Sequence, residues 1–338
     1  MLSLCTHGNI LHMDNLTLHG ANPQNLYRAF NIEIPQKILD FSTNTNILAW
    51  PDIRINLEGL AKHYPDPDCS RLRELIAQRE HISPSRVLFT NGSNEAIFLL
   101  SQILTGNTAI LQPAYPEYYR AFSGLQGIFS PSEAGKFRNA IIINPANPSG
   151  KYRYLHELTA SHQATTFIID EAYRDFLLAC EPERLCDFPN VIILRSLTKI
   201  FHLSGARIGY VIAPEQIITA LHERQPSWSV NAIAQELALH FLQDESFTAR
   251  TREFYREAVP AFVEGVRAAG FETVRSDVHF FLIMVNDDER VIRRLLEAGI
   301  VVRHTRNFAG LCGKYVRVAT RKPEENNRLI TALKEYLS

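Results

Sequence analysis

Side chains that can do chemistry recur directly after short apolar runs of this 338-residue sequence. Asp170 and Tyr173 follow one such run, Asn147 follows a second and Lys199 follows a third. These residues supply an amine, a carboxylate with a phenol three residues on, and the amide of a polar turn, each at the end of an apolar run. Taken singly, each residue also has an ordinary structural explanation, as a helix cap, a turn residue or a solvated lysine.

A fourth apolar run leads into Thr90-Asn91-Gly92-Ser93-Asn94-Glu95 and then into an apolar helix that begins near Ala96. Free backbone N–H groups at a helix start bind phosphate, because the helix dipole places partial positive charge there. Ser93 or Asn94 could instead serve only as the N-cap of this helix. The segment therefore predicts either a phosphate site or a capped helix start.

The apolar runs themselves predict the element that positions these groups. Six are short, rich in β-branched residues and followed by Gly, Pro, Asn or Asp: 86–89, 108–111, 140–143, 166–169, 191–194 and 208–212. Near-continuous apolar strands are typical of a sheet covered on both faces by helices. The expected fold is thus α/β with a mainly parallel sheet, and ligands bind such sheets beyond the carboxyl ends of the strands.

From about residue 215 the pattern changes to longer helices. Two strand-like runs, 279–285 and 315–319, bracket a helical stretch at 288–298, which predicts a smaller α+β domain packed against the first. We expect an N-terminal arm and substrate loop at 1–45, a large domain at 46–225 and a small domain at 226–338, with a cleft between the two domains.

Composition excludes several classes of partner. Lys plus Arg number 35 and Asp plus Glu number 36, so no basic field exists to attract nucleic acid or an anionic membrane. The sequence shows no secretory signal and no membrane-spanning apolar stretch, which predicts a cytoplasmic protein. Five scattered cysteines predict reduced thiols rather than a disulfide framework: Cys5, Cys69, Cys180, Cys186 and Cys312.

Two other kinds of site fail on spacing. His7, His12 and His19 fit no regular ligand geometry on one helix, and no carboxylate or cysteine set accompanies them, so no metal site is expected. The segment from Gly310 to Tyr315 lacks the spacing and the Ser or Thr of a phosphate-binding P-loop.

Taken together and in this order, the motifs resemble the fold type I family of pyridoxal phosphate enzymes, the aspartate aminotransferase superfamily, over nearly the whole chain. The resemblance implies pyridoxal 5′-phosphate as the cofactor. Lys199 would form the Schiff base, Asp170 would pair with the pyridine nitrogen, and Asn147 and Tyr173 would donate to the ring oxygen. Tyr115 would stack on the ring.

The same resemblance implies a phosphate-binding set, which consists of Ser93, Asn94, Ser196 and Arg207. Tyr64 would reach the phosphate of the neighbouring subunit, so a homodimer is expected. The sequence departs from the family at Ala146, where a longer polar residue is common, and between Tyr119 and Asn144. Only 24 residues intervene there, so a helix and a strand of the large domain could be missing.

Six segments are similar to those of threonine-phosphate decarboxylases of cobalamin biosynthesis: 19–22, 39–46, 64–69, 308–311, 315–321 and 323–327. This similarity implies that Arg317 binds the substrate α-carboxylate through a bidentate fork and that Arg321 binds the substrate phosphate. Asn44 is expected at the substrate, and His19 and Asn22 either contact its phosphate or only order the arm. Arg303 and Arg306 are further candidates.

The reaction that this similarity implies is decarboxylation of L-threonine O-phosphate to (R)-1-amino-2-propanol O-phosphate and CO2. Histidinol-phosphate aminotransferases share most of the same features and remain the alternative, because the two reactions differ only in which Cα bond breaks. L-serine O-phosphate is a third candidate, since one methyl group is worth only about 1–3 kcal/mol of discrimination.

Overall fold

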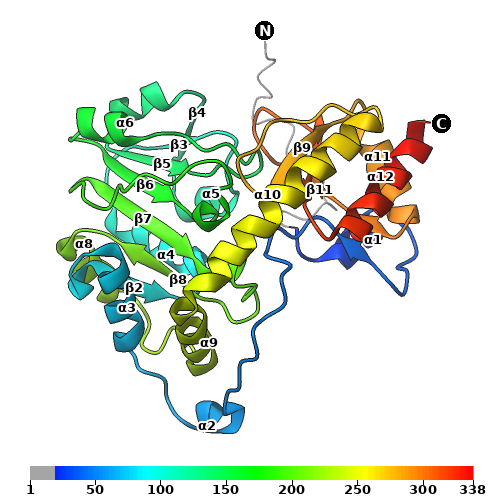
Figure 1. Cartoon of the computed structure of the whole chain (residues 1–338). Helices are drawn as coiled ribbons and strands as arrows, with labels where there is room; N and C mark the ends of the chain where they lie inside the picture. Colours follow the sequence, from blue (N-terminus) through cyan, green and yellow to red (C-terminus); the bar gives the residue numbers. More distant parts are fainter. Residues whose placement is uncertain (1–19, 338) are drawn as a thin grey trace.

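A seven-stranded sheet forms the larger half of the molecule in the computed structural model, which describes residues 20–337 (Figure 1). The strands lie in the order β2-β8-β7-β6-β5-β3-β4. Strands β3 to β7 run parallel to one another, and only β8 runs antiparallel to its neighbours β2 and β7. The prediction of an α/β fold with a mainly parallel sheet is therefore confirmed. The strands are β2 (Val87–Thr90), β3 (Thr108–Leu111), β4 (Gln126–Ile128), β5 (Asn139–Ile143), β6 (Thr166–Asp170), β7 (Val191–Ser196) and β8 (Gly209–Ile212).

The strands are apolar on both faces because helices cover both faces of the sheet. Successive side chains of β5 enter different cores: Ile141 and Ile143 pack on one side, and Ile142 packs on the other. One face is covered by α4 (Gly92–Ile103), α5 (Glu117–Ala121) and α8 (Glu215–His222). The other face is covered by α3 (Ser70–Glu80), α6 (His156–Ser161) and α9 (Ala232–Gln243).

The short connection between Tyr119 and Asn144 contains the strands β4 and β5. It contains the edge strand β4 and then a 3-10 helix, Pro131–Lys136, which begins with a capping box between Ser130 and Glu133. The segment thus forms one strand and one short helix before the chain enters β5.

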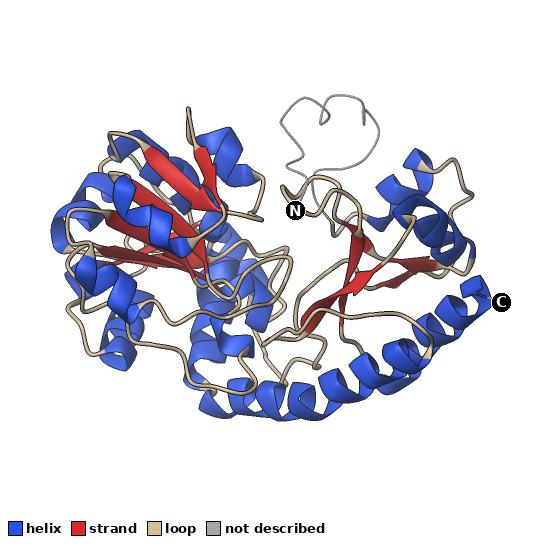
Figure 2. Cartoon of the chain, turned by 90° about the horizontal axis from the view of Figure 1, so that it is seen from above, coloured by secondary structure: helices blue, strands red, loops and turns tan. Residues whose placement is uncertain are grey.

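A second, antiparallel sheet forms the smaller half, with the strand order β11-β12-β9 (Figure 2). Its strands are β9 (Phe280–Met284), β11 (Arg303–His304) and β12 (Tyr315–Ala319), and its helices are α11 (Asp288–Glu297) and α12 (Pro323–Leu337). The N-terminal segment joins this half: β1 (Leu39–Asp40) pairs with β10 (Ile300–Val301), and α1 (Pro23–Ala29) buries Leu26 and Tyr27 in its core.

The long helix α10 (Glu245–Ala268) connects the two cores. Phe247 and Tyr255 pack in the core of the large sheet, whereas Phe262 and Val266 pack in that of the small sheet. Because α9 also packs on the large core, the two cores divide within α10, beyond the division at residue 226 that the sequence predicts. In Figure 2 this helix runs beneath both sheets.

Among the described helices, none combines the length and apolar character that crossing a membrane requires. Cys69, Cys180 and Cys186 are free thiols, whereas Cys312 is bonded in a disulfide. The expectation of reduced thiols is therefore wrong for Cys312, because a count of scattered cysteines does not reveal which ones the fold brings together. Cys5 lies outside the described residues.

Candidate active site

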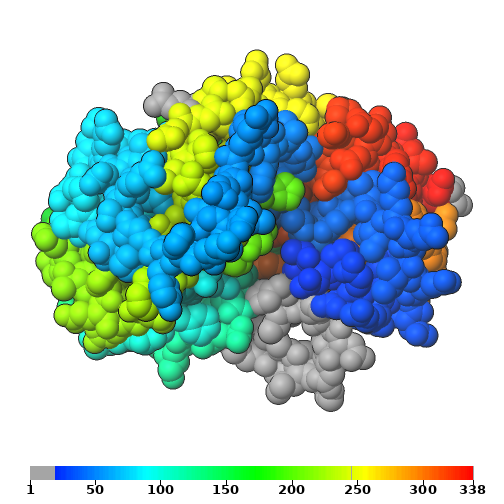
Figure 3. Space-filling view, turned by 90° about the horizontal axis from the view of Figure 1, so that it is seen from below, coloured from blue at the N-terminus to red at the C-terminus, as the bar shows by residue number. Residues whose placement is uncertain are grey.

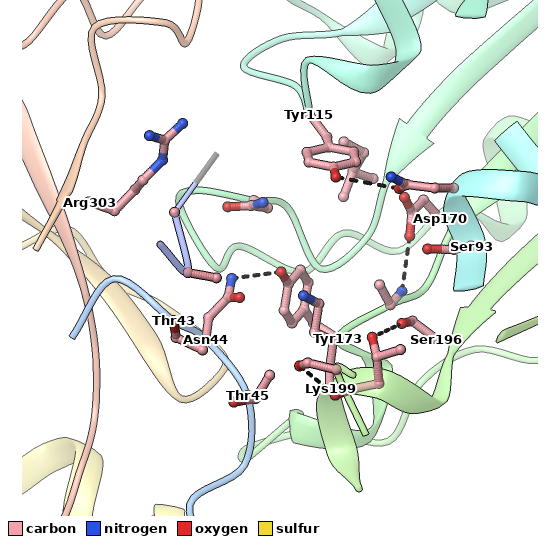
Figure 4. A pocket seen from close by; sticks show the side chains of 18 of the residues that line it. Thr43, Asn44, Thr45, Ser93, Tyr115, Asp170, Tyr173, Ser196, Lys199 and Arg303 are labelled. Atoms are coloured by element: carbon pink, nitrogen blue, oxygen red, sulfur yellow. Dashed lines mark hydrogen bonds between the residues drawn. The ribbon is translucent and has the colours of Figure 1, made fainter. Parts of the chain in front are cut away.

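A cavity opens at the carboxyl ends of β5, β6 and β7 and faces the small sheet (Figure 4). Parallel strands end at a common edge, so the polar residues that follow them meet there. Every residue that the sequence predicted for the cofactor, except Tyr64, lines this cavity: Ser93, Asn94, Tyr115, Asn147, Asp170, Tyr173, Ser196, Lys199 and Arg207. Of the predicted substrate residues, Asn44 and Arg317 line it as well.

Lys199 lies in α7 (Leu197–Ile200), a single helical turn directly after β7. Asn46 fixes this turn, since its backbone N–H donates to the Lys199 carbonyl at 2.9 Å and its side chain donates to the Ile200 carbonyl at 2.9 Å. Burial, together with the positive charges of Arg317 and Arg207, lowers the pKa of Lys199 to about 8. Roughly a tenth of the amine is thus neutral and nucleophilic at pH 7, far more than for an ordinary lysine.

Asp170 is the last residue of β6 and is buried. Its Oδ2 accepts a hydrogen bond from the Tyr118 hydroxyl at 2.9 Å, and its Oδ1 accepts one from the Ala172 backbone N–H at 3.1 Å. Burial raises the pKa of Asp170, while these donors and Lys199 oppose the rise. A buried carboxylate that is held only by neutral donors suits a protonated ring nitrogen.

The sequence analysis did not single out Tyr118, which is the side-chain donor to Asp170. No local pattern indicates its role, because Tyr118 lies in α5 and Asp170 ends β6, so only the fold brings the two side chains together. Its phenol is buried, and both burial and the negative charge of Asp170 raise its pKa well above the ordinary value. The hydroxyl therefore stays protonated and can only donate to the Asp170 carboxylate.

Asn147 and Tyr173 face the same part of the cavity as Asp170. Asn147 Oδ1 accepts a hydrogen bond from Arg317 Nη1 at 2.6 Å, which leaves its amide N–H groups for another acceptor. The Tyr173 hydroxyl accepts from Asn44 Nδ2 at 2.6 Å, and burial raises the pKa of Tyr173. Both side chains can thus act as neutral donors toward one anionic oxygen.

The phosphate-binding residues meet at the start of α4. A Cβ on Gly92, whose φ is +70°, would overlap the Arg207 guanidinium, and a Cβ on Gly209 would lie 2.9 Å from the Ser93 backbone nitrogen. Two glycines thus let the helix start, β8 and Arg207 approach closely. Ser196 faces the same space and shares a 2.7 Å hydrogen bond with Thr198, a lining residue that the sequence analysis did not single out.

Two buried arginines lie opposite each other on neighbouring strands of the small sheet. Arg303 of β11 pairs in register with Arg317 of β12, both are more than nine-tenths buried, and both line the cavity. Burial and the charge of Arg317 lower the pKa of Arg303 to about 9. The Arg303 guanidinium also contacts His304 Nε2 at 2.8 Å and donates to Asn307 Oδ1 at 3.0 Å.

Arg321 does not line the cavity, contrary to the expectation that it binds the substrate. Strand β12 ends at Ala319, so the alternation that points Arg317 into the cavity stops before residue 321. The Arg321 guanidinium instead pairs with Glu325 at 3.0 Å and donates to the Asp40 carbonyl at 3.1 Å. Arg306 also turns away, because Asp288 binds its guanidinium through two contacts of 2.6 and 2.7 Å.

The remaining predicted residues lie apart from the cavity or outside the described chain. Tyr64 is 82% exposed and stacks on Trp228 with ring centroids 4.7 Å apart. Asn22 precedes α1 and is exposed, although its neighbour Ala21 lines the cavity. His19, like His7 and His12, lies outside the described residues. Within residues 20–337, no cluster of His, Cys, Asp and Glu could hold a metal ion.

Comparison with known proteins identifies one family and two kinds of relative within it. Residues 37–333 match the family model described as aminotransferase class I and II. The threonine-phosphate decarboxylase of Salmonella typhimurium is 30% identical over 95% of this chain and 96% of that protein. The histidinol-phosphate aminotransferase of Nitratidesulfovibrio vulgaris is 32% identical over 82% of each. The crystal structure of L-threonine-O-3-phosphate decarboxylase from Porphyromonas gingivalis superposes with a TM-score of 0.77, at 26% identity, over 89% of this chain and 99% of that one.

Proposed function

The chain belongs to the aminotransferase class I and II family and uses pyridoxal 5′-phosphate, and from that premise we propose that it decarboxylates L-threonine O-phosphate. The cavity fits the cofactor in three places. The start of α4 with Arg207 suits a phosphate, the buried Asp170 carboxylate suits a protonated ring nitrogen, and Lys199 suits the aldehyde.

Bound pyridoxal phosphate supplies a ring that can accept the electrons released when a bond to the substrate Cα breaks. The protein provides the remaining groups. Asp170, oriented by donors on both of its oxygens, would accept a hydrogen bond from the ring nitrogen. Lys199, with a pKa of about 8, can carry a proton to or from the substrate Cα near neutral pH.

The observation that carries the proposed substrate is the pair of buried arginines, Arg303 and Arg317. L-threonine O-phosphate has a carboxylate and a phosphate, so it offers one anionic group to each guanidinium. Arginine suits both groups, because its charged N–H donors form strong hydrogen bonds to carboxylate and phosphate oxygens. In this proposal Arg317 binds the carboxylate and Arg303 binds the phosphate, the role that the sequence analysis gave to Arg321.

Transamination of histidinol phosphate is the second candidate, because the histidinol-phosphate aminotransferase of Nitratidesulfovibrio vulgaris is 32% identical to this chain. Its keto-acid acceptor, 2-oxoglutarate, also carries two anionic groups that two arginines could bind. L-serine O-phosphate remains a close substrate analogue, since it differs from threonine phosphate by one methyl group.

One assay separates these reactions. Purified enzyme with pyridoxal phosphate is given L-threonine O-phosphate alone, or histidinol phosphate with 2-oxoglutarate, and both released CO2 and formed glutamate are measured. We expect stoichiometric CO2 and an amino-alcohol phosphate from threonine phosphate, with no need for a keto acid. Glutamate from histidinol phosphate, without CO2 from threonine phosphate, would assign the chain to the aminotransferases.

We also propose that the enzyme is a homodimer in which Tyr64 binds the cofactor phosphate of the partner subunit. Supporting this, Trp50, Leu57, Tyr64 and Trp228 are exposed aromatic or apolar side chains, and the segment that carries the first three lies on the outer face seen in Figure 3. Sedimentation should show a dimer at assay concentration, and Tyr64→Phe should weaken cofactor retention several-fold while leaving the dimer intact. A fully active monomer would contradict the proposal.

A further inference from the structure

His279 is a buried histidine that lies behind the candidate site and does not line the cavity. It immediately precedes β9, and its ring packs against the tilted ring of Phe176 with centroids 3.7 Å apart. Its Nε2 lies 3.0 Å from the backbone carbonyl of Asn44, whereas its Nδ1 has no hydrogen-bond partner among the described residues. Residues 44 and 279 are far apart in sequence, so this contact joins the cavity-lining loop at residues 42–45 to the small sheet.

The contact fixes the protonation of the ring. A backbone carbonyl can only accept, so Nε2 must carry the hydrogen and Nδ1 must be bare in the neutral ring. The charged groups near the ring are Arg317 and Lys199, and the phenols of Tyr173 and Tyr255 also pack near it. Burial and the two cations lower the pKa of His279 to about 3, so the ring stays a neutral donor across the working pH range.

A second hydrogen bond connects Asn44 to Tyr173, which lines the cavity. Asn44 Nδ2 donates to the Tyr173 hydroxyl at 2.6 Å, as Figure 4 shows. The phenol oxygen accepts in this bond, so the hydrogen of the phenol must point elsewhere. Because Tyr173 lines the cavity, the open direction for this hydrogen is toward the bound ligand.

We propose that His279 is a positioning residue for the cofactor: its hydrogen bond to Asn44 keeps the Asn44 amide on Tyr173 and so turns the Tyr173 hydroxyl toward the ring oxygen of pyridoxal phosphate. This inference rests on the proposed role of Tyr173. The loop itself has other supports, since Asp40 accepts from Ser42 N at 2.7 Å and from Thr43 Oγ1 at 2.6 Å. Loss of the His279 donor should therefore misalign Asn44 without unfolding the loop.

The test measures the pH midpoint of the visible absorbance change of the cofactor-loaded protein. A donor to the anionic ring oxygen stabilises its deprotonated form, so removing that donor raises the midpoint. We expect Tyr173→Phe to raise it by about one pH unit or more. His279→Phe, which keeps a stacking ring but deletes the donor, should raise it in the same direction by roughly half as much. His279→Gln supplies an amide N–H of similar reach in place of the ring N–H, so its midpoint should equal that of the wild-type protein.

Two further variants complete the design. Tyr255→Phe changes the same aromatic cluster, with a ring centroid 5.1 Å from that of His279, and should leave the midpoint unchanged. The double variant His279→Phe/Tyr173→Phe should shift no further than Tyr173→Phe alone, because both changes act through one hydroxyl. Thermal melting of each variant reports stability separately from the midpoint.

The outcomes distinguish the inference from the proposed role of Tyr173. If Tyr173→Phe leaves the midpoint unchanged, the assigned role of Tyr173 fails. If Tyr173→Phe shifts it but His279→Phe only lowers the melting temperature, His279 is merely structural and the inference is overturned. Should His279→Phe fail to fold, Asn44→Ala tests the same chain of hydrogen bonds at a residue outside the aromatic cluster. An unshifted midpoint in Asn44→Ala overturns the inference equally.

Discussion

Replacing Lys199 with alanine is expected to lower the rate of turnover by about 10³-fold or more, because one amine serves as both the cofactor-binding nucleophile and the proton carrier. The covalent attachment can be checked directly. After borohydride reduction of the loaded wild-type protein, the pyridoxyl group should be found by mass spectrometry on the peptide that contains Lys199. The Lys199→Ala protein should carry no pyridoxyl group, whereas Lys334→Ala, which changes an exposed lysine of α12, should behave like wild type. A pyridoxyl group on another lysine would contradict the assignment.

The lowered pKa of Lys199 adds a pH dependence with a defined sign. Only the neutral amine attacks an aldehyde, and the pKa of this amine lies at about 8 instead of 10.5. When apoenzyme is mixed with pyridoxal phosphate, the rate of capture should therefore rise as the pH passes through about 8 and level off above it. A rise centred near the ordinary lysine value would show that the cations Arg317 and Arg207 and the burial of the amine do not act as the structure implies.

The sequence predicted the centre of this site because the chemistry-bearing residues follow adjacent parallel strands. β5, β6 and β7 lie side by side, so Asn147, Asp170 and Lys199 reach one edge of the sheet although they are far apart in the chain. Apolar runs revealed the strands, and the polar residues after them revealed the edge. Both signals are local, which is why they can be read without a structure.

The parts that the sequence did not predict depend on contacts between distant segments. Arg303 lies on a strand of only two residues, and nothing local indicates that it pairs in register with Arg317. Arg321 was favoured because it is four residues from Arg317, but that spacing puts two side chains on one face only while the strand continues. The contact of His279 with Asn44 likewise joins residues 235 positions apart.

Arg317 should give the second large effect. Its guanidinium donates to two neutral acceptors, Asn147 Oδ1 and the Ser42 carbonyl, both at 2.6 Å. A bidentate bond to a substrate carboxylate contains two charge-assisted hydrogen bonds of about 1.5–3 kcal/mol each. Arg317→Met should thus reduce kcat/KM by about 10²- to 10⁴-fold. Arg317→Lys should recover only part of this, because it restores the charge but not the fork.

A matched series on the other arginines separates the substrate groups. Arg303→Met should reduce kcat/KM for the phosphorylated amino acid by about ten- to a hundredfold, the worth of one charge-assisted contact, while unphosphorylated L-threonine is processed no worse than by wild type. Arg321→Met should change KM little, because its guanidinium is held by Glu325 and the Asp40 carbonyl outside the cavity. Both single variants keep Arg317, so a difference between them reports only which arginine binds the phosphate. The opposite result would be a lower kcat/KM for the phosphorylated substrate in Arg321→Met but not in Arg303→Met. The phosphate would then bind beyond the end of β12. In that case the pair of Arg303 and Arg317 could not explain how a substrate with two anionic groups is bound.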